Sequence, residues 1–167
     1  TDTRNGWATR GFFGRINYDY DGRYLLEVNG RYDGSSRFAS DHRWGFFPSV
    51  SLGWNITRES FMEKSLEVLS NLKLRASWGL LGNQSGAGLY TFTSIMGIQP
   101  LGNWYFQDGR DMYINAPGVI DPFTTWEKVE SKNLGLDFGF FNNALTGTFD
   151  VFQRDTKDML GPSADLA

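Results

Sequence analysis

The chain has 167 residues with 16 basic and 19 acidic side chains, which give a formal net charge of −3. This near balance argues against a nucleic-acid partner, since proteins that bind phosphates usually carry a basic excess. The absence of cysteine and the single histidine, His42, exclude disulfides, thiol catalysis and multi-histidine metal sites.

The first predicted elements are two strands joined by a tight turn. From Phe12 to Tyr20 and from Tyr24 to Asp33, nearly every second residue is apolar or aromatic. Such alternation is typical of a strand with one apolar and one polar face. The intervening Asp21-Gly22 is a dipeptide favoured in two-residue hairpin turns, so this segment is predicted to be a β-hairpin.

Four further runs show the same alternation: Trp44–Ile56, Leu72–Leu80, Asn133–Phe140 and Leu145–Arg154. Most runs match the roughly 9–11 residues that a tilted membrane strand needs, whereas soluble strands most often have about 5–6. No window approaches 18 consecutive apolar residues, so no membrane-spanning helix is predicted. We therefore expect an all-β, antiparallel protein whose strands are long enough to cross a bilayer.

The connections alternate in character along the chain. Asp21-Gly22 and Phe141–Ala144 are tight, and Thr57–Asn71 is predicted to hold a short helix, because Ser60-Phe61-Met62-Glu63 matches a capping box. Gly34–Arg43 and Gly82–Thr125 are longer polar loops. Strand order puts the two turns and the helix at one end and both polar loops at the other. Outer-membrane barrels have this asymmetry, with short periplasmic turns and long external loops.

The two faces of the predicted strands differ in chemistry. The apolar face has large aromatic residues near the strand ends, such as Tyr24, Trp44 and Trp54, as the headgroup levels of a bilayer favour. The opposite face carries many charges, which a dry core would not accept without pairing. We expect this face to line a wet barrel lumen, with the lumen-facing residues Arg15, Glu27, Arg31, Asp33 and Arg75.

Six strands are too few for a closed membrane barrel, since the known range begins at about 8. An open sheet would leave backbone donors and acceptors unpaired in lipid, at a cost of several kcal/mol each. The chain is therefore predicted to be an antiparallel segment of a larger transmembrane β-barrel.

Three stretches carry a family resemblance. They are Tyr32–Phe38 with Arg43–Ser51; Phe61-Met62 with Leu72–Gly79 and Gly82-Asn83-Gln84; and Trp126-Glu127 with Asn133–Gly139 and Thr156–Leu160. In this order they resemble the SusC/RagA family of TonB-dependent outer-membrane transporters, over nearly the whole chain.

The resemblance implies that residues 1–167 are part of a barrel of about 22 strands, without the plug domain that such barrels enclose. It also implies the outer membrane of a Gram-negative bacterium and the import of oligosaccharides or oligopeptides. The implied partners are a SusD-like surface lipoprotein, TonB acting through the plug, the rest of the barrel and outer-membrane lipid. No catalytic residue, metal ion or cofactor is implied.

One segment of the longest loop is a candidate contact site. Trp104, Tyr105, Phe106 and Tyr113 lie among polar residues, and aromatic faces beside polar groups suit sugars, peptides or protein partners. Packing of these rings against the loop or the barrel wall is the alternative. The hypothesis is that this loop contacts cargo or the lipoprotein.

Two other classes of protein remain open at this point. One is a soluble β-sandwich that binds carbohydrate, which would need the aromatic face as its core. The other is a glycoside hydrolase fragment, which would need a carboxylate pair set across a cleft.

Overall fold

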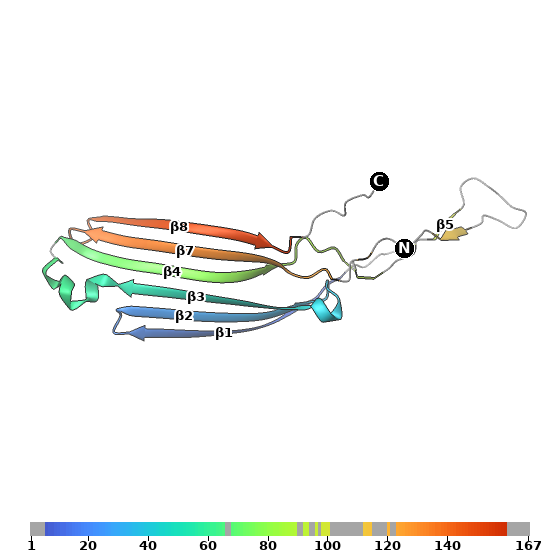
Figure 1. Cartoon of the computed structure of the whole chain (residues 1–167), viewed down its shortest axis with the longest axis horizontal. Helices are drawn as coiled ribbons and strands as arrows, with labels where there is room; N and C mark the ends of the chain where they lie inside the picture. Colours follow the sequence, from blue (N-terminus) through green and yellow to red (C-terminus); the bar gives the residue numbers. More distant parts are fainter. Residues whose placement is uncertain are drawn as a thin grey trace, which may run out of the picture.

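The computed structural model describes residues 6–65, 68–89, 92–93, 96, 98–100, 112–114, 120 and 123–159. Most of these residues form a single six-stranded antiparallel sheet with strand order β1-β2-β3-β4-β7-β8 (Figure 1). Its strands are β1 (Thr9–Tyr20), β2 (Tyr24–Ser35), β3 (Trp44–Asn55), β4 (Leu69–Asn83), β7 (Glu127–Phe140) and β8 (Leu145–Lys157). Two short strands, β5 (Ile98–Pro100) and β6 (Met112–Ile114), pair with each other.

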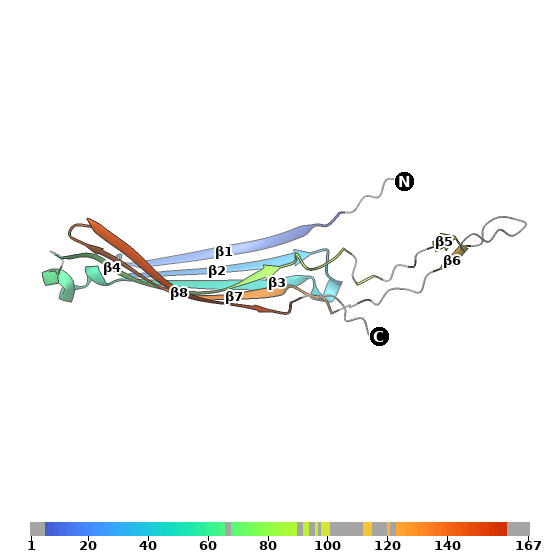
Figure 2. The same cartoon turned by 90° about the horizontal axis from the view of Figure 1, so that it is seen from above.

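All six predicted strands are confirmed, and each neighbouring pair is antiparallel. Within the described residues the sheet stays open, because β1 and β8 each pair on one side only. Seen from above in Figure 2, the sheet is twisted and curved. The prediction of an antiparallel segment of a larger barrel therefore agrees with the observed sheet.

The predicted helix over Thr57–Asn71 is different in the structure. Two 3-10 helices, η2 (Ile56–Arg58) and η3 (Ser60–Ser65), occupy its first part, and β4 already begins at Leu69. Leu69 pairs with Phe140 of β7, so sheet pairing extends further than the alternation of the sequence indicated. Among the described residues, no helix has the length and apolar character needed to cross a bilayer.

The two ends of the sheet differ as predicted. The β1–β2 turn, the η2–η3 segment and the β7–β8 turn lie at one end, which we call the turn end (Figure 1). The β2–β3 connection with η1 (Ser40–His42) and the β4–β7 connection leave the opposite end, which we call the loop end. Asp21 and Gly22 have φ of 54° and 61°, the left-handed values that a type I′ hairpin turn requires.

The strand register gives the sheet one apolar and one polar face. One row across all six strands reads Tyr18, Leu26, Leu52, Ala76, Leu134 and Val151. The next row, on the opposite face, reads Asn17, Glu27, Ser51, Ser77, Asn133 and Phe152. A one-residue slip in register would exchange these faces, so the alternation strongly constrains the pairing.

The apolar face is uncovered. Ile16, Leu134 and Phe149 are 70%, 53% and 64% exposed, although each is a large apolar residue in a strand. A β-sandwich would bury this face against a second sheet, and the described residues contain no such layer. The fold therefore disfavours a soluble carbohydrate-binding sandwich and favours lipid as the solvent of this face.

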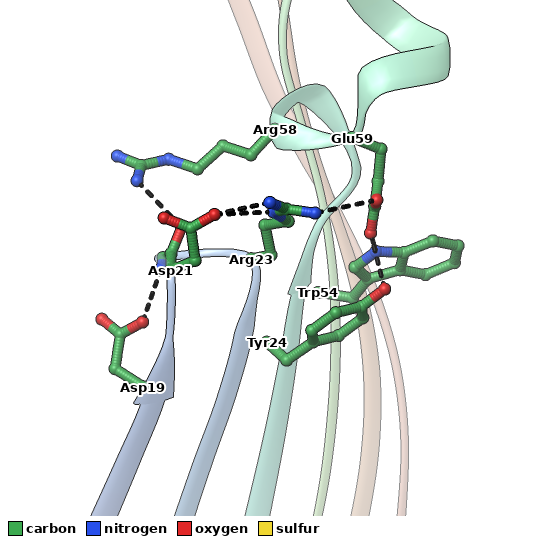
Figure 3. A network of polar contacts seen from close by, with 8 residues as sticks. Asp19, Asp21, Arg23, Tyr24, Trp54, Arg58 and Glu59 are labelled. Carbon is green, nitrogen blue, oxygen red and sulfur yellow. Dashed lines mark hydrogen bonds and ion pairs between the residues drawn. The ribbon is translucent and has the colours of Figure 1, made fainter.

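A network of polar contacts, shown in Figure 3, ties the first hairpin to the η2–η3 segment. The Tyr24 hydroxyl and the Trp54 indole N–H both donate to Glu59 Oε1, at 2.7 and 2.9 Å. Arg23 Nη2 donates a hydrogen bond to Asp21 Oδ2 at 2.6 Å, and Arg23 Nη1 lies 3.8 Å from Glu59 Oε2. We call these five residues the turn-end clasp. Tyr24 and Trp54 are the last residues of the apolar face at the turn end. The clasp therefore marks the level at which this face gives way to polar groups.

The clasp predicts an acid-sensitive contribution to stability. The hydrogen bond from Tyr24, with that from Trp54 and the charge of Arg23, lowers the pKa of Glu59 below its ordinary 4.5. A lowered pKa in the folded state stabilises the fold above that ordinary value, and this contribution is lost as the pH falls through the lowered pKa. Glu59→Gln should therefore destabilise the intact barrel at pH 7 and differ less from wild type in acid. Denaturant unfolding at a series of pH values measures this difference.

The matched control is Glu63→Gln, a change of an exposed carboxylate on η3 that makes none of the clasp contacts. A difference between Glu59→Gln and wild type that stays constant from pH 7 to strong acid would contradict this role of the carboxylate.

Candidate functional site

The five predicted lumen residues share the polar face. Arg15 and Glu27 lie on neighbouring strands, with Asn29 between their polar groups: Arg15 Nε donates to Asn29 Oδ1 at 2.7 Å, and Asn29 Nδ2 donates to Glu27 Oε1 at 2.8 Å. Arg31 and Asp33, two residues apart on β2, are 3.1 Å apart at their closest charged atoms. The structure thus gathers these charges into pairs on one face, and their exposure to a lumen stays a prediction.

Arg75 joins three strands on this face. Its guanidinium makes a two-pronged contact with Asp137 of β7, with N–O distances of 2.8 and 2.9 Å, and lies 3.3 Å from Asp150 of β8. The side chain reaches β8 by passing over Gly135, where a Cβ atom would lie 2.9 Å from Arg75 Nη2. Thr148 also donates to Asp137, at 3.0 Å. A glycine on β7 therefore opens the path for a charge network that the strand pattern alone does not indicate.

The loop end of the polar face contains a hollow of about 500 Å³. Its lining includes Phe13, Arg31, Asp33, Asn83 and Gln84. Phe13 is 84% exposed, which is unusual for a phenylalanine on a face otherwise rich in charges. An exposed ring among planar amide, carboxylate and guanidinium groups can stack on a flat or apolar group while hydrogen bonding beside it. We call this the mouth hollow.

One wall of the mouth hollow is part of a small core. Phe38, Phe47, Ala87 and Trp126 are each at most 5% exposed and form the buried apolar cluster of the described residues. The Trp126 ring centroid lies 5.2 Å from that of Phe38 and 5.4 Å from that of Phe47. Phe47 belongs to β3 on the polar face, and Gly82 of β4 has no side chain where its ring lies. We call these four residues the loop-end core.

Hydrogen bonds tie both polar loops to the loop-end core. The Trp126 indole donates to the Arg43 carbonyl at 3.0 Å, and Arg37 Nη1 donates to the carbonyls of Ala87 and Gln84 at 3.0 and 3.3 Å. The bases of the two loops are therefore fixed against each other over the polar face. Residues 83 and 84, which line the mouth hollow, lie at the fixed base of the second loop. The hollow is therefore preorganised.

Sequence reasoning missed the mouth hollow and the loop-end core. The available signal was the presence of two aromatic residues, Phe13 and Phe47, at positions of the polar face.

The predicted contact residues Trp104, Tyr105 and Phe106 lie outside the described residues, and Tyr113 is described only as part of the backbone of β6. Their role stays a prediction. In the part of the chain that the structure describes, no group of three or more histidine or acidic side chains is arranged to hold a metal ion.

Among family models, "TonB dependent receptor-like, beta-barrel" matches the chain over residues 1–167. The chain is 41% identical to the TonB-dependent receptor SusC of Bacteroides thetaiotaomicron and 34% identical to the TonB-dependent receptor P26 of Formosa agariphila. These alignments cover 94% and 96% of the chain. Each covers only 16% of the relative, so the chain spans a small part of the length of these proteins.

Solved structures show the same relationship. The chain superposes on a structure of the RagAB peptide transporter with a TM-score of 0.77 and 33% identity, covering 92% of this chain and 16% of that one. A structure of the RagAB peptide importer in the "open-open" state gives a TM-score of 0.75 with 32% identity over 90% of the chain. Both the sequence and the shape of the sheet are therefore similar to those of known barrels.

Proposed function

This chain belongs to the TonB-dependent receptor-like β-barrel family, and from that premise we propose that it is a wall segment of a SusC-like outer-membrane importer of oligosaccharides or oligopeptides. The carrying observation is the exposed apolar face on one side of the sheet and, on the other side, a polar face on which Arg15, Arg31 and Arg75 pair with carboxylates. A sheet with these faces can separate lipid from a wet lumen. The family is one of transporters rather than enzymes, and we assign no catalytic residue.

The mouth hollow supports a role of this segment in cargo contact. At the loop end, which corresponds to the outside of such barrels, it presents one exposed ring beside charged and amide groups. The similarity to RagAB, described as a peptide transporter, supports peptide cargo, and the resemblance of the sequence motifs to the SusC/RagA family keeps oligosaccharides as the other class.

We extend this proposal to the rest of the import machinery. We propose that a SusD-like lipoprotein covers the loop end, and that TonB supplies energy through a plug enclosed by the complete barrel. Cargo would bind at the mouth first and then pass inward when the plug moves. The Arg75 network and its neighbours would keep the lumen side of the wall polar and water-filled during this passage.

Gene deletion in the source bacterium tests this function. Loss of the gene for the complete protein should abolish uptake of either a defined oligosaccharide mixture or a defined peptide mixture, and loss of TonB should have the same effect. Uptake of both mixtures at wild-type rates in the deletion strain would refute the proposal.

A variant of the mouth hollow tests the role of this segment. Phe13→Ala in the complete protein should weaken binding of the imported cargo about fivefold, since stacking on an aromatic ring contributes on the order of 1 kcal/mol. The control is Phe152→Ala, because Phe152 is also on the polar face and 73% exposed but does not line the hollow. Isothermal titration with purified protein measures both. Equal affinities for Phe13→Ala and wild type would remove the hollow from the cargo path.

A further inference from the structure

The loop end of β4 has a strand edge without a partner. β4 pairs with β7 as far as Asn83, but its ladder with β3 stops at the pair of Gly79 and Ser49. The next residue of β3 toward the loop end, Pro48, has no backbone N–H with which to extend a ladder. The edge of β4 that points away from β7 is therefore unpaired over residues 80–83, and no backbone hydrogen bond from another described segment reaches it.

This end of β4 lies over the polar side of the sheet. By the alternation of β4, Gly82 occupies a position of the apolar face, as Trp78 and Leu80 do. A Cβ atom at Gly82 would nevertheless overlap the ring of Phe47, whose side chain is on the polar face of β3. The end of β4 has consequently left the plane of β3 and lies over it, on the side that the proposed function assigns to the lumen.

The unpaired edge borders the mouth hollow. One side of the hollow is lined by residues 82–84, and another by Phe13, Arg31 and Asp33 of β1 and β2. β3 lies between these strands in the sheet but contributes none of the described lining residues, so the hollow lies over β3. At Gly82 no side chain of its own covers the backbone of β4.

An unpaired strand edge is selective for the chemistry of its ligand. It presents a backbone N–H and C=O at every second residue, about 7 Å apart along the strand. An extended peptide has the complementary groups at the same spacing and can add to such an edge as a further strand. An oligosaccharide has no backbone amides and cannot form this ladder.

We propose that the unpaired edge of β4, residues 80–83, binds an extended peptide as an added strand within the mouth hollow. This rests on the proposed function and selects peptides from its two cargo classes. The edge has room for about four peptide residues, and their side chains alternate in direction. Every second side chain therefore points to the side of the hollow that carries Phe13. The ladder provides affinity for peptides of varied sequence, and Phe13 favours a flat or apolar side chain beside it.

Methylation of the peptide backbone tests the ladder. The complete protein in detergent is incubated with a pool of random-sequence pentapeptides, and the peptide retained most strongly is identified by mass spectrometry. It is resynthesised with each backbone nitrogen methylated in turn, which removes one N–H and leaves every side chain in place. Isothermal titration should show binding weakened at least about fivefold by methylation at alternate positions, and by less than about twofold at the positions between them.

Two controls make the result specific. Peptide binding should slow amide hydrogen exchange in residues 80–83 but leave it unchanged in residues 73–77, where β4 pairs with both β3 and β7. In Phe13→Ala the affinity should fall, but the alternating effect of methylation should remain, because the ladder does not involve that ring.

Three results would overturn the proposal. One is binding that is insensitive to methylation at every position. Another is exchange in residues 80–83 that, without peptide, is as slow as in residues 73–77, since another part of the complete protein would then occupy the edge. The third is that no peptide of the pool binds. Loss of oligosaccharide uptake in the deletion strain would still support the import function in that case, so the two failures are distinct.

Discussion

Val50→Arg in the complete barrel should lower the free energy of unfolding by about 2–4 kcal/mol, the cost of a cation near the middle of the lipid-facing band. Val50 lies between Trp44 and Trp54 on β3 and faces Val28 and Trp78 on the neighbouring strands. An arginine there would have lipid on one side and only apolar neighbours along the sheet. Urea unfolding in lipid vesicles measures the change, and the amount of folded protein in the membrane fraction gives a second readout.

The control for this prediction is the next residue. Ser51→Arg places the same side chain on the polar face, opposite Glu27 of β2. We expect a change of less than about 1 kcal/mol there, because an exposed ion pair has a small effect of either sign. Equal destabilisation by the two variants would show that the apolar face does not meet lipid.

Trp126→Ala should remove about 3–5 kcal/mol from the local stability of the loop end, as expected for a buried tryptophan replaced by alanine. Trp126 is 5% exposed and contacts the rings of Phe38 and Phe47. Its loss also leaves the Arg43 carbonyl without the indole donor. We expect faster amide hydrogen exchange in residues 36–43 and 84–87, with little change at the turn end.

Trp126→Phe separates the two contributions of this residue. Phenylalanine keeps a ring against Phe38 and Phe47 but loses the hydrogen bond, which contributes about 1 kcal/mol. Its exchange rates should therefore fall between those of wild type and Trp126→Ala. Unchanged exchange in Trp126→Ala would mean that the polar loops are not held by the loop-end core.

The sequence by itself determined the strands, their faces and the two ends of the sheet. These properties depend on the period of two in residue polarity and on local turn chemistry, both of which are visible without knowing any partner strand. The segments Phe12–Tyr20 and Tyr24–Asp33 with Asp21-Gly22 between them were sufficient to predict the first hairpin. The apolar face followed from the same alternation, and the open sheet edges followed from the strand count, since six strands are too few to close a membrane barrel.

Only the tertiary structure decided which side chains meet. Arg75 contacts Asp150 through a space left by Gly135, and Trp126 packs on Phe47, although these partners are far apart along the chain. Glu59 likewise meets Tyr24 only because η2, which ends directly before it, turns the chain back toward the first hairpin. Residue polarity specifies the face on which a side chain lies, but not its neighbours there. Those neighbours depend on strand register, on missing side chains at glycines and on loops folding back over the sheet.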